Sequence, residues 1–362
     1  MPLQDLQAHD IKLPSPPAIA VRILEAVRRQ DSSFRDLARV IAADPALTVK
    51  LLKVANSSFY GLSNKVSSVE GAVSILGIDA VTNIALSFVI ARDLQGKSGP
   101  DFNFDLFWKR SVTTAVSAKL CATRLGVAFP DAFVCGLLQD IGMLVIYLSR
   151  PEDYRPLLDE IRHGNENLQD AEQQALGFDH QQVGAELLRY WQLSPAIWGP
   201  LRTHHDPAAL PAAYRQQGEV LQVAGFLSAL YNGSEHGLTL RRLTTLLKER
   251  WHLPGEEIEA LLDAVAENSI ELFEGFEIDP GQMMPYSLLL QEANEELGRL
   301  NLSYEQLVVE LKLAKQKAEG LAKNLQQANQ QLQEIANRDG LTGLFNYRYF
   351  QEALDLELER RP

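Results

Sequence analysis

Apolar residues recur at intervals of three and four through most of the first 290 residues, the spacing of helices with one buried face. In the segment DPALTVKLLKVANSSFYG, residues 44–61, Leu47, Leu51 and Val54 fall on one face. Asp44 precedes this pattern as an expected N-cap. In the segment SSVEGAVSILG, Ser67 and Glu70 have the spacing of a capping box. No run alternates with the period of a strand for long, so the pattern predicts an all-α body.

The most apolar segment, AFVCGLLQDIGMLVIYL, covers residues 132–148 and carries two polar residues, Gln139 and Asp140, at its middle. An ionised group is most costly at the centre of a bilayer, so a membrane span is disfavoured although the length is close to sufficient. We expect one buried helix and no membrane.

After residue 290 the pattern changes to a regular alternation of three- and four-residue steps, kept for about five heptads. This period is typical of the seam of a left-handed coiled coil, and a long helix lying on the domain surface is the alternative. We predict a parallel homodimer through residues 291–337. The seam comprises Leu297, Leu300, Tyr304, Leu307, Leu311, Ala314, Ala318, Leu321, Leu325, Ala328, Leu332 and Ile335.

Composition narrows the possible partners and location. The net charge of −13 disfavours a broad phosphate-binding face, so no nucleic acid is expected. The two cysteines, Cys121 and Cys135, have neither a CxxC nor a metal-binding spacing and are expected to be buried thiols in a reducing cytoplasm. The first residues lack the basic start and apolar core of a signal peptide.

The last residues, NRDGLTGLFNYRYF and onward, resemble the start of the GGDEF, or diguanylate cyclase, domain. Tyr347 departs from the usual arginine of that motif. The resemblance implies that residues 338–362 are the N-terminal fragment of an α/β GGDEF domain; a generic turn before an amphipathic helix is the alternative. The matching residues are Asp339, Leu341, Thr342, Gly343, Leu344, Asn346, Arg348 and Phe350.

The catalytic loop of that family, Gly-Gly-Asp/Glu-Glu-Phe, does not occur in the sequence up to Pro362. We therefore expect no cofactor in this chain, and Mg²⁺ and GTP only for a complete GGDEF domain.

Several segments of the body, in order, resemble the HDOD domain, a helical relative of the HD phosphohydrolases found in bacterial signalling proteins. They include LPSPPAIAVRILE, FWKRSVTTAVSAKL, AFVCGLLQDIGMLVI, FDHQQVGAELLRYWQLS and THHDP. The resemblance covers residues 13–207, and residues 208–290 are expected to extend the same helical domain, which then comprises residues 1–290.

The resemblance also implies which residues stand at the metal site of the HD superfamily. The first histidine position holds Arg110, the His-Asp pair is Gln139 and Asp140, and the late aspartate position holds Gly225. A permanent guanidinium repels a metal and an amide replaces imidazole poorly. We therefore expect a degenerate site without a catalytic metal or hydrolase activity. The remaining members of the site are His180, His204 and His205.

Two further expectations concern the surviving residues of this site. A buried Asp140 without a metal needs a positive partner, so we predict an ion pair with Arg110 or a hydrogen-bond network shared with Gln139 and His180. The histidines are expected to have structural roles. The alternative is a weak residual metal site of Asp140, His180 and His204 or His205.

These observations together favour a non-catalytic signal-transduction module that controls a diguanylate cyclase output through a dimeric coiled coil. The signal is not written in any motif. Two alternatives stay open: a metal-dependent HD-type phosphohydrolase acting on a nucleotide, and a protein-interaction scaffold without enzymatic output.

Overall fold

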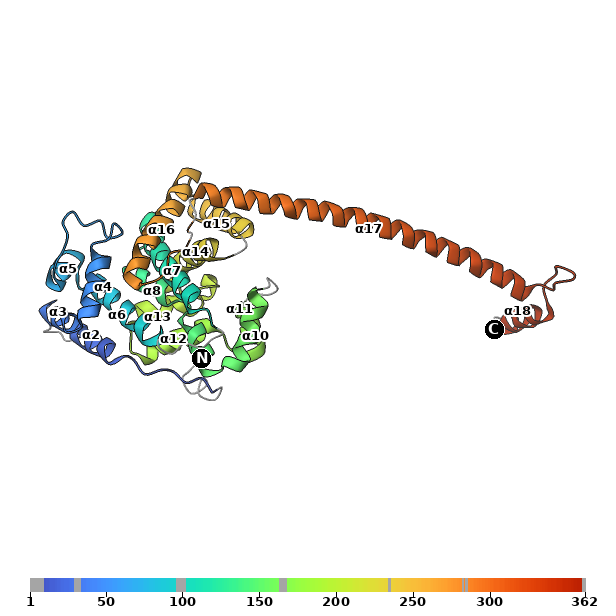
Figure 1. The fold of residues 1–362 in the computed structure, drawn as a ribbon. Helices are drawn as coiled ribbons and strands as arrows, with labels where there is room; N and C mark the ends of the chain where they lie inside the picture. Colours follow the sequence, from blue (N-terminus) through green and yellow to red (C-terminus); the bar gives the residue numbers. More distant parts are fainter. Residues whose placement is uncertain are drawn as a thin grey trace. The chain divides into compact units, whose positions relative to one another are not determined.

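The protein is built from helices, and no sheet occurs among the residues that the structure describes (Figure 1). This computed structural model describes residues 10–28, 34–95, 102–162, 168–233, 236–281, 283 and 286–359. The predicted all-α fold of the body is confirmed. The only strand-like contact within the described ranges is an isolated bridge between Arg338 and Phe345.

Clustering of contacts divides the chain into two compact units, Met1–Asn294 and Glu295–Pro362. The helices of the first unit, before the long helix α17, are α2 (Ala18–Arg28), α3 (Phe34–Ala42), α4 (Pro45–Ala55), α5 (Val69–Leu76), α6 (Ile78–Gln95), α7 (Phe104–Arg124), α8 (Ala132–Leu138), α9 (Ile141–Ser149), α10 (Pro151–Arg162), α11 (Leu168–Leu176), α12 (His180–Tyr190), α13 (Pro195–Leu201), α14 (Ala212–Asn232), α15 (His236–Trp251) and α16 (Gly255–Phe276).

Helix α7 is the central packing element of the first unit, in contact with α8, α14 and α16 (Figure 1). Its buried face carries many small residues, so neighbouring helices approach closely. At Gly136 of α8, an added Cβ would lie 2.6 Å from the carbonyl oxygen of Thr114 on α7. Glycine is therefore needed at this crossing, which places the end of α8 beside α7.

The helix starts largely follow the capping residues of the sequence. The Asp44 side chain accepts a hydrogen bond from the Leu47 amide (3.1 Å), as predicted. The predicted start at Ser67 is wrong by one residue, because Ser68 has the extended backbone of an N-cap and accepts from the Gly71 amide (3.0 Å).

The expectation of one continuous helix over residues 132–148 is wrong. The segment forms α8 and α9, which meet in a turn at Gln139 and Asp140. Ala132–Ser149 is the one described stretch apolar and long enough to cross a membrane by composition, yet 78% of it is buried inside the protein. Such burial is what core helices show, and it leaves little apolar surface for lipid.

Helix α17 (Tyr286–Asn337) is continuous over 52 residues. The seam leucines whose side chains are described are exposed: Leu307, Leu311, Leu321, Leu325 and Leu332, with Ile335. The side chains of Leu297, Leu300 and Tyr304 lie outside the described part. A turn follows at Asp339, and α18 (Tyr347–Glu359) ends the described chain.

Candidate functional site

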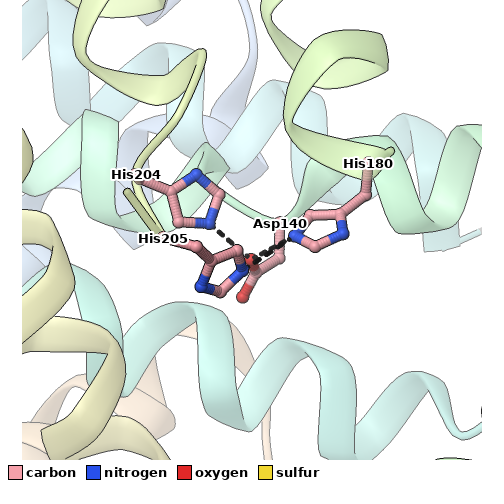
Figure 2. A group of neighbouring side chains, drawn as sticks. All are labelled: Asp140, His180, His204 and His205. Atoms are coloured by element: carbon pink, nitrogen blue, oxygen red, sulfur yellow. Dashed lines mark hydrogen bonds and ion pairs between the residues drawn. The ribbon is translucent and has the colours of Figure 1, made fainter. Parts of the chain in front are cut away.

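Four polar side chains converge in the first unit: Asp140, His180, His204 and His205 (Figure 2). One ligand atom from each lies within 4.8 Å of those of the other three. Asp140 comes from the turn between α8 and α9, His180 is the first residue of α12, and both remaining histidines lie in the turn after α13. The four residues named as weak metal candidates from the sequence are thus brought together.

The approach of α9 to α12 depends on glycine. A Cβ at Gly142 would lie 1.9 Å from the carbonyl oxygen of His180 and 2.7 Å from the amide nitrogen of Gly184. No side chain fits in that space, so the two helices cross backbone to backbone. This crossing carries Asp140, two residues before Gly142, to the start of α12.

Two of the imidazole rings have Nδ1 hydrogen-bonded on the side away from Asp140. His180 Nδ1 lies 2.6 Å from a carboxylate oxygen of Glu172, on α11. His204 Nδ1 donates to the carbonyl oxygen of Leu201 at 2.9 Å. Both rings are therefore oriented with Nε2 toward Asp140.

Asp140 is compensated by histidines. Its Oδ1 lies 3.7 Å from Nε2 of His180 and 3.4 Å from Nε2 of His204. Burial by itself would raise the pKa of Asp140, but the contact with His204 and the positive charges of His204, His180 and Arg110 hold it well below its usual range. Asp140 is therefore an anion at neutral pH.

His180 has the complementary shift. Burial opposes its charged form, but the negative charges of Glu172, Asp140 and Asp179 raise the pKa of His180 to about 9. Without a metal, a protonated His180 donates Nδ1–H to Glu172, and its Nε2–H faces His205 Nε2 at 3.1 Å. The protonated ring is thus a positive partner for Asp140, with Nε2 at 3.7 Å from its Oδ1.

The predicted ion pair between Arg110 and Asp140 does not form within the described residues. The side chain of Arg110 is exposed and acts on Asp140 only through its charge at longer range. Gln139 is buried and its Oε1 has no partner, so it does not join a network with Asp140. A Cβ added at Gly225 would lie 3.4 Å from Nε2 of Gln139, so Gly225 lies beside Gln139.

The donor set fits a single divalent cation. Zinc ligands at ~2.0–2.1 Å stand about 3.3 Å apart in a tetrahedron. The separations here are 3.1 Å between Nε2 of His180 and His205, 3.4 Å from His204 to Asp140 and 3.7 Å from His180 to Asp140. Because Nδ1 of His204 donates to Leu201, the neutral form of this ring directs the Nε2 lone pair toward Asp140, where a cation could accept it. Three imidazoles and one carboxylate suit zinc or a similar transition metal better than magnesium.

Sequence reasoning missed Glu172, Tyr154 and Gly142. Glu172 lies in a short amphipathic helix rich in glutamine, where an acid is expected to be exposed, and it is fully buried instead. The only local signal was the small residue at Gly142, directly after the polar pair.

Proteins similar to this chain include an uncharacterized protein of Treponema pallidum, 26% identical over 207 residues. That match covers 56% of this chain and 39% of the relative, so the chain spans well under half of the relative's length.

Solved structures share the fold. A candidate phosphohydrolase from Shewanella amazonensis is 22% identical with a TM-score of 0.59, over 75% of this chain and 97% of that one. An HDOD domain protein of unknown function from Geobacter sulfurreducens is 23% identical with a TM-score of 0.54, over 83% and 95%. A candidate signal transduction protein from Marinobacter aquaeolei is 23% identical with a TM-score of 0.57, over 78% and 62%.

The family model of the HDOD domain matches residues 13–207, which is more than half of the chain and includes all four residues of the cluster. This is the range that the sequence motifs indicated. The chain belongs to the HDOD domain family.

Proposed function

We propose that the chain is a regulatory module of bacterial signal transduction, in which the HDOD body controls a diguanylate cyclase output through a dimeric coiled coil. The proposal is supported by membership of the HDOD family, which is related to signal-transduction proteins and HD phosphohydrolases. The output and the dimer are our inference from the C-terminal residues. A cytoplasmic location fits this role, with no nucleic acid or membrane as partner.

The observation that carries the proposal is helix α17. It is continuous from Tyr286 to Asn337 and leads directly into the Asp339 turn that begins the GGDEF-like motif. The seam leucines whose side chains the structure describes are exposed, Leu311 to 70% and Leu325 to 66%. Such a stripe is stable in water when a second copy covers it. A dimer would place two output domains near each other, as two-subunit cyclase chemistry requires.

The dimer is tested by one charged substitution on the seam and one beside it. Leu311→Glu puts a carboxylate in the seam, whereas Leu313→Glu changes an equally apolar residue, 61% exposed, outside it. We expect Leu311→Glu to weaken dimerisation at least about tenfold in analytical ultracentrifugation, because burying an unpaired charge is costly. Leu313→Glu should dimerise like the unchanged chain. Equal behaviour of the two variants, or a monomeric parent, contradicts the coiled coil.

The output is tested on the protein encoded by the continuous reading frame. A Gly-Gly-Asp/Glu-Glu-Phe loop downstream, together with cyclic di-GMP formed from GTP and Mg²⁺, supports the cyclase. A frame that lacks the loop and makes no product favours the scaffold alternative.

A second candidate function has its own observation, the inward-facing Nε2 atoms of the three histidines around Asp140. We propose that one divalent transition-metal ion binds there. Such an ion supplies Lewis acidity and lowers the pKa of a bound water. With Arg110, Gln139 and Gly225 at the other superfamily positions, we expect this ion to serve regulation and not hydrolysis.

Metal analysis and assays of nucleotide hydrolysis distinguish a regulatory metal site from a phosphohydrolase site. One tightly bound metal per chain without hydrolysis of cyclic dinucleotides or other nucleotides supports a regulatory site. Metal-dependent hydrolysis supports the phosphohydrolase alternative. No bound metal at saturating Zn²⁺ rules out both metal-dependent functions.

A further inference from the structure

Glu172 is the charged group behind the cluster, and it does not face the cluster's centre. It lies on α11 with 0% of its surface exposed. Its Oε2 accepts the backbone N–H of His180 at 2.8 Å and contacts Nδ1 of the same residue at 2.6 Å. Its Oε1 accepts the hydroxyl of Tyr154, on α10. Three donors from two other helices therefore fix one buried carboxylate.

We propose that Glu172, locked by Tyr154, is the positioning residue of the metal site: it holds the His180 ring so that Nε2 presents its lone pair to the cation. This inference rests on the metal site proposed above. One oxygen of the carboxylate, Oε2, is hydrogen-bonded to both the backbone N–H and the ring Nδ1 of His180. The start of α12 and the rotation of the ring are therefore fixed together.

The other histidines show why a carboxylate matters at this position. His204 is oriented by the neutral carbonyl of Leu201. His205 has its backbone N–H on Oε1 of Gln181, which fixes the main chain and not the ring. Glu172 is thus the only anion behind a ring of the cluster among the described residues. A carboxylate bound to Nδ1–H raises the basicity of the other nitrogen, which strengthens its bond to a borderline cation such as Zn²⁺.

A role in packing alone does not explain a buried carboxylate. A neutral glutamine has nearly the same shape, and burying a charge costs several kcal/mol unless it is well paired. Here the pairing is made with a ring that faces Asp140. The placement is therefore the carboxylate–histidine–metal arrangement that orients ligands in metal sites.

The test measures Zn²⁺ binding by isothermal titration calorimetry with the full chain after removal of metals. We expect one Zn²⁺ per chain for the parent, and Glu172→Gln should keep that stoichiometry while binding about 10- to 100-fold more weakly. The matched control is Glu186→Gln. Glu186 is also a buried acid, 7% exposed, but it lies on α12 and pairs with Arg189 (2.9 Å). Its variant should bind Zn²⁺ like the parent.

A second readout follows the ring itself. In the zinc-loaded parent, long-range ¹H–¹⁵N NMR spectra should show His180 with its proton on Nδ1 and a metal-bound Nε2. Glu172→Gln should broaden or shift this signal and leave that of His204 unchanged. A variant that only loosens the fold would disturb both rings.

The outcomes distinguish failure of the metal site from failure of the positioning role of Glu172. A parent that binds no Zn²⁺ overturns the metal site and the role of Glu172 with it. A parent that binds Zn²⁺ while Glu172→Gln binds equally tightly leaves the metal site standing and overturns the positioning role. If Glu172→Gln does not fold, Tyr154→Phe decides, because it removes only the hydroxyl that locks the carboxylate. We expect about tenfold weaker binding for that variant, and unchanged affinity would overturn the inference.

Discussion

The candidate site and helix α17 are built in opposite ways. The site joins Asp140 to histidines that lie 40 to 65 positions later in the sequence, buries His180 and His204 to 1% exposure, and depends on a crossing at Gly142 where no side chain fits. Helix α17 repeats a local pattern over 52 residues, and its leucines are exposed. A Cβ added at a glycine should therefore destabilise the site severely and helix α17 little. The protonation of a side chain should be coupled to folding only in the site.

The largest effect is expected from glycine to alanine in the two regions. Gly142→Ala forces a Cβ to within 1.9 Å of the His180 carbonyl, so α9 and α12 must separate. We expect a loss of about 3 kcal/mol or more in the free energy of unfolding, at the upper end of overpacking effects. Urea denaturation followed by circular dichroism measures it.

The matched change is Gly320→Ala in α17, where an added Cβ meets no atom within 4 Å. Alanine forms helix better than glycine, so this helix should gain about 0.5–1 kcal/mol. Similar effects of the two substitutions would remove the contrast between the regions.

The second largest effect is expected on the stability of the metal-free HDOD domain as the pH changes. The pKa of His180 is about 9 when folded, against ~6.5 unfolded, so the folded state binds the proton more tightly. The resulting stabilisation is fully present below pH 6.5 and is lost as the pH rises toward 9, on the order of 2–3 kcal/mol.

Denaturation with a chelator present, repeated between pH 6 and 9.5, tests this dependence. His180→Gln should flatten the curve, because this variant lacks the ring whose protonation is coupled to folding. A parent curve without a decline in this interval would show that His180 does not carry the charge that compensates Asp140.

The smallest effect is expected at the Asp339 turn. Oδ1 of Asp339 accepts from the amides of Leu341 (3.2 Å) and Thr342 (3.0 Å) and from the Thr342 hydroxyl (2.8 Å). These bonds also lower the pKa of Asp339, first of all the one from the Thr342 hydroxyl. Asp339→Ala should speed hydrogen exchange of both amides roughly fivefold, as loss of a cap does. Asp355→Ala, on the exposed part of α18, should not. Unchanged exchange would mean that the turn is held by its backbone bonds alone.

The sequence predicted much of the helical framework, because caps and apolar periods act within a few residues. Asp44 is an N-cap as expected. The errors were also local. The N-cap is Ser68 and not the predicted Ser67, and the segment 132–148, predicted as one helix, forms two helices separated by Gln139 and Asp140. Periodicity continues through that polar pair, so it could not indicate the turn.

The candidate site was named only in part. The four residues of the cluster could be listed from motif order. The expected partners of Asp140 were Arg110, or Gln139 and His180 in a shared network, and the structure instead places His180 and His204 beside it. Glu172 could not be found, because an acid in a short polar helix has the same local signal whether it faces water or a buried ring.

The sequence by itself determined that this chain is helical, that its body is an HDOD domain and where polar residues interrupt apolar segments, since these depend on residue types and their spacing. Only the tertiary structure decided which of those polar residues meet. The close crossing at Gly142 and the buried carboxylate of Glu172 set the direction of the His180 ring, and they join α9, α11 and α12 through contacts that no local pattern encodes.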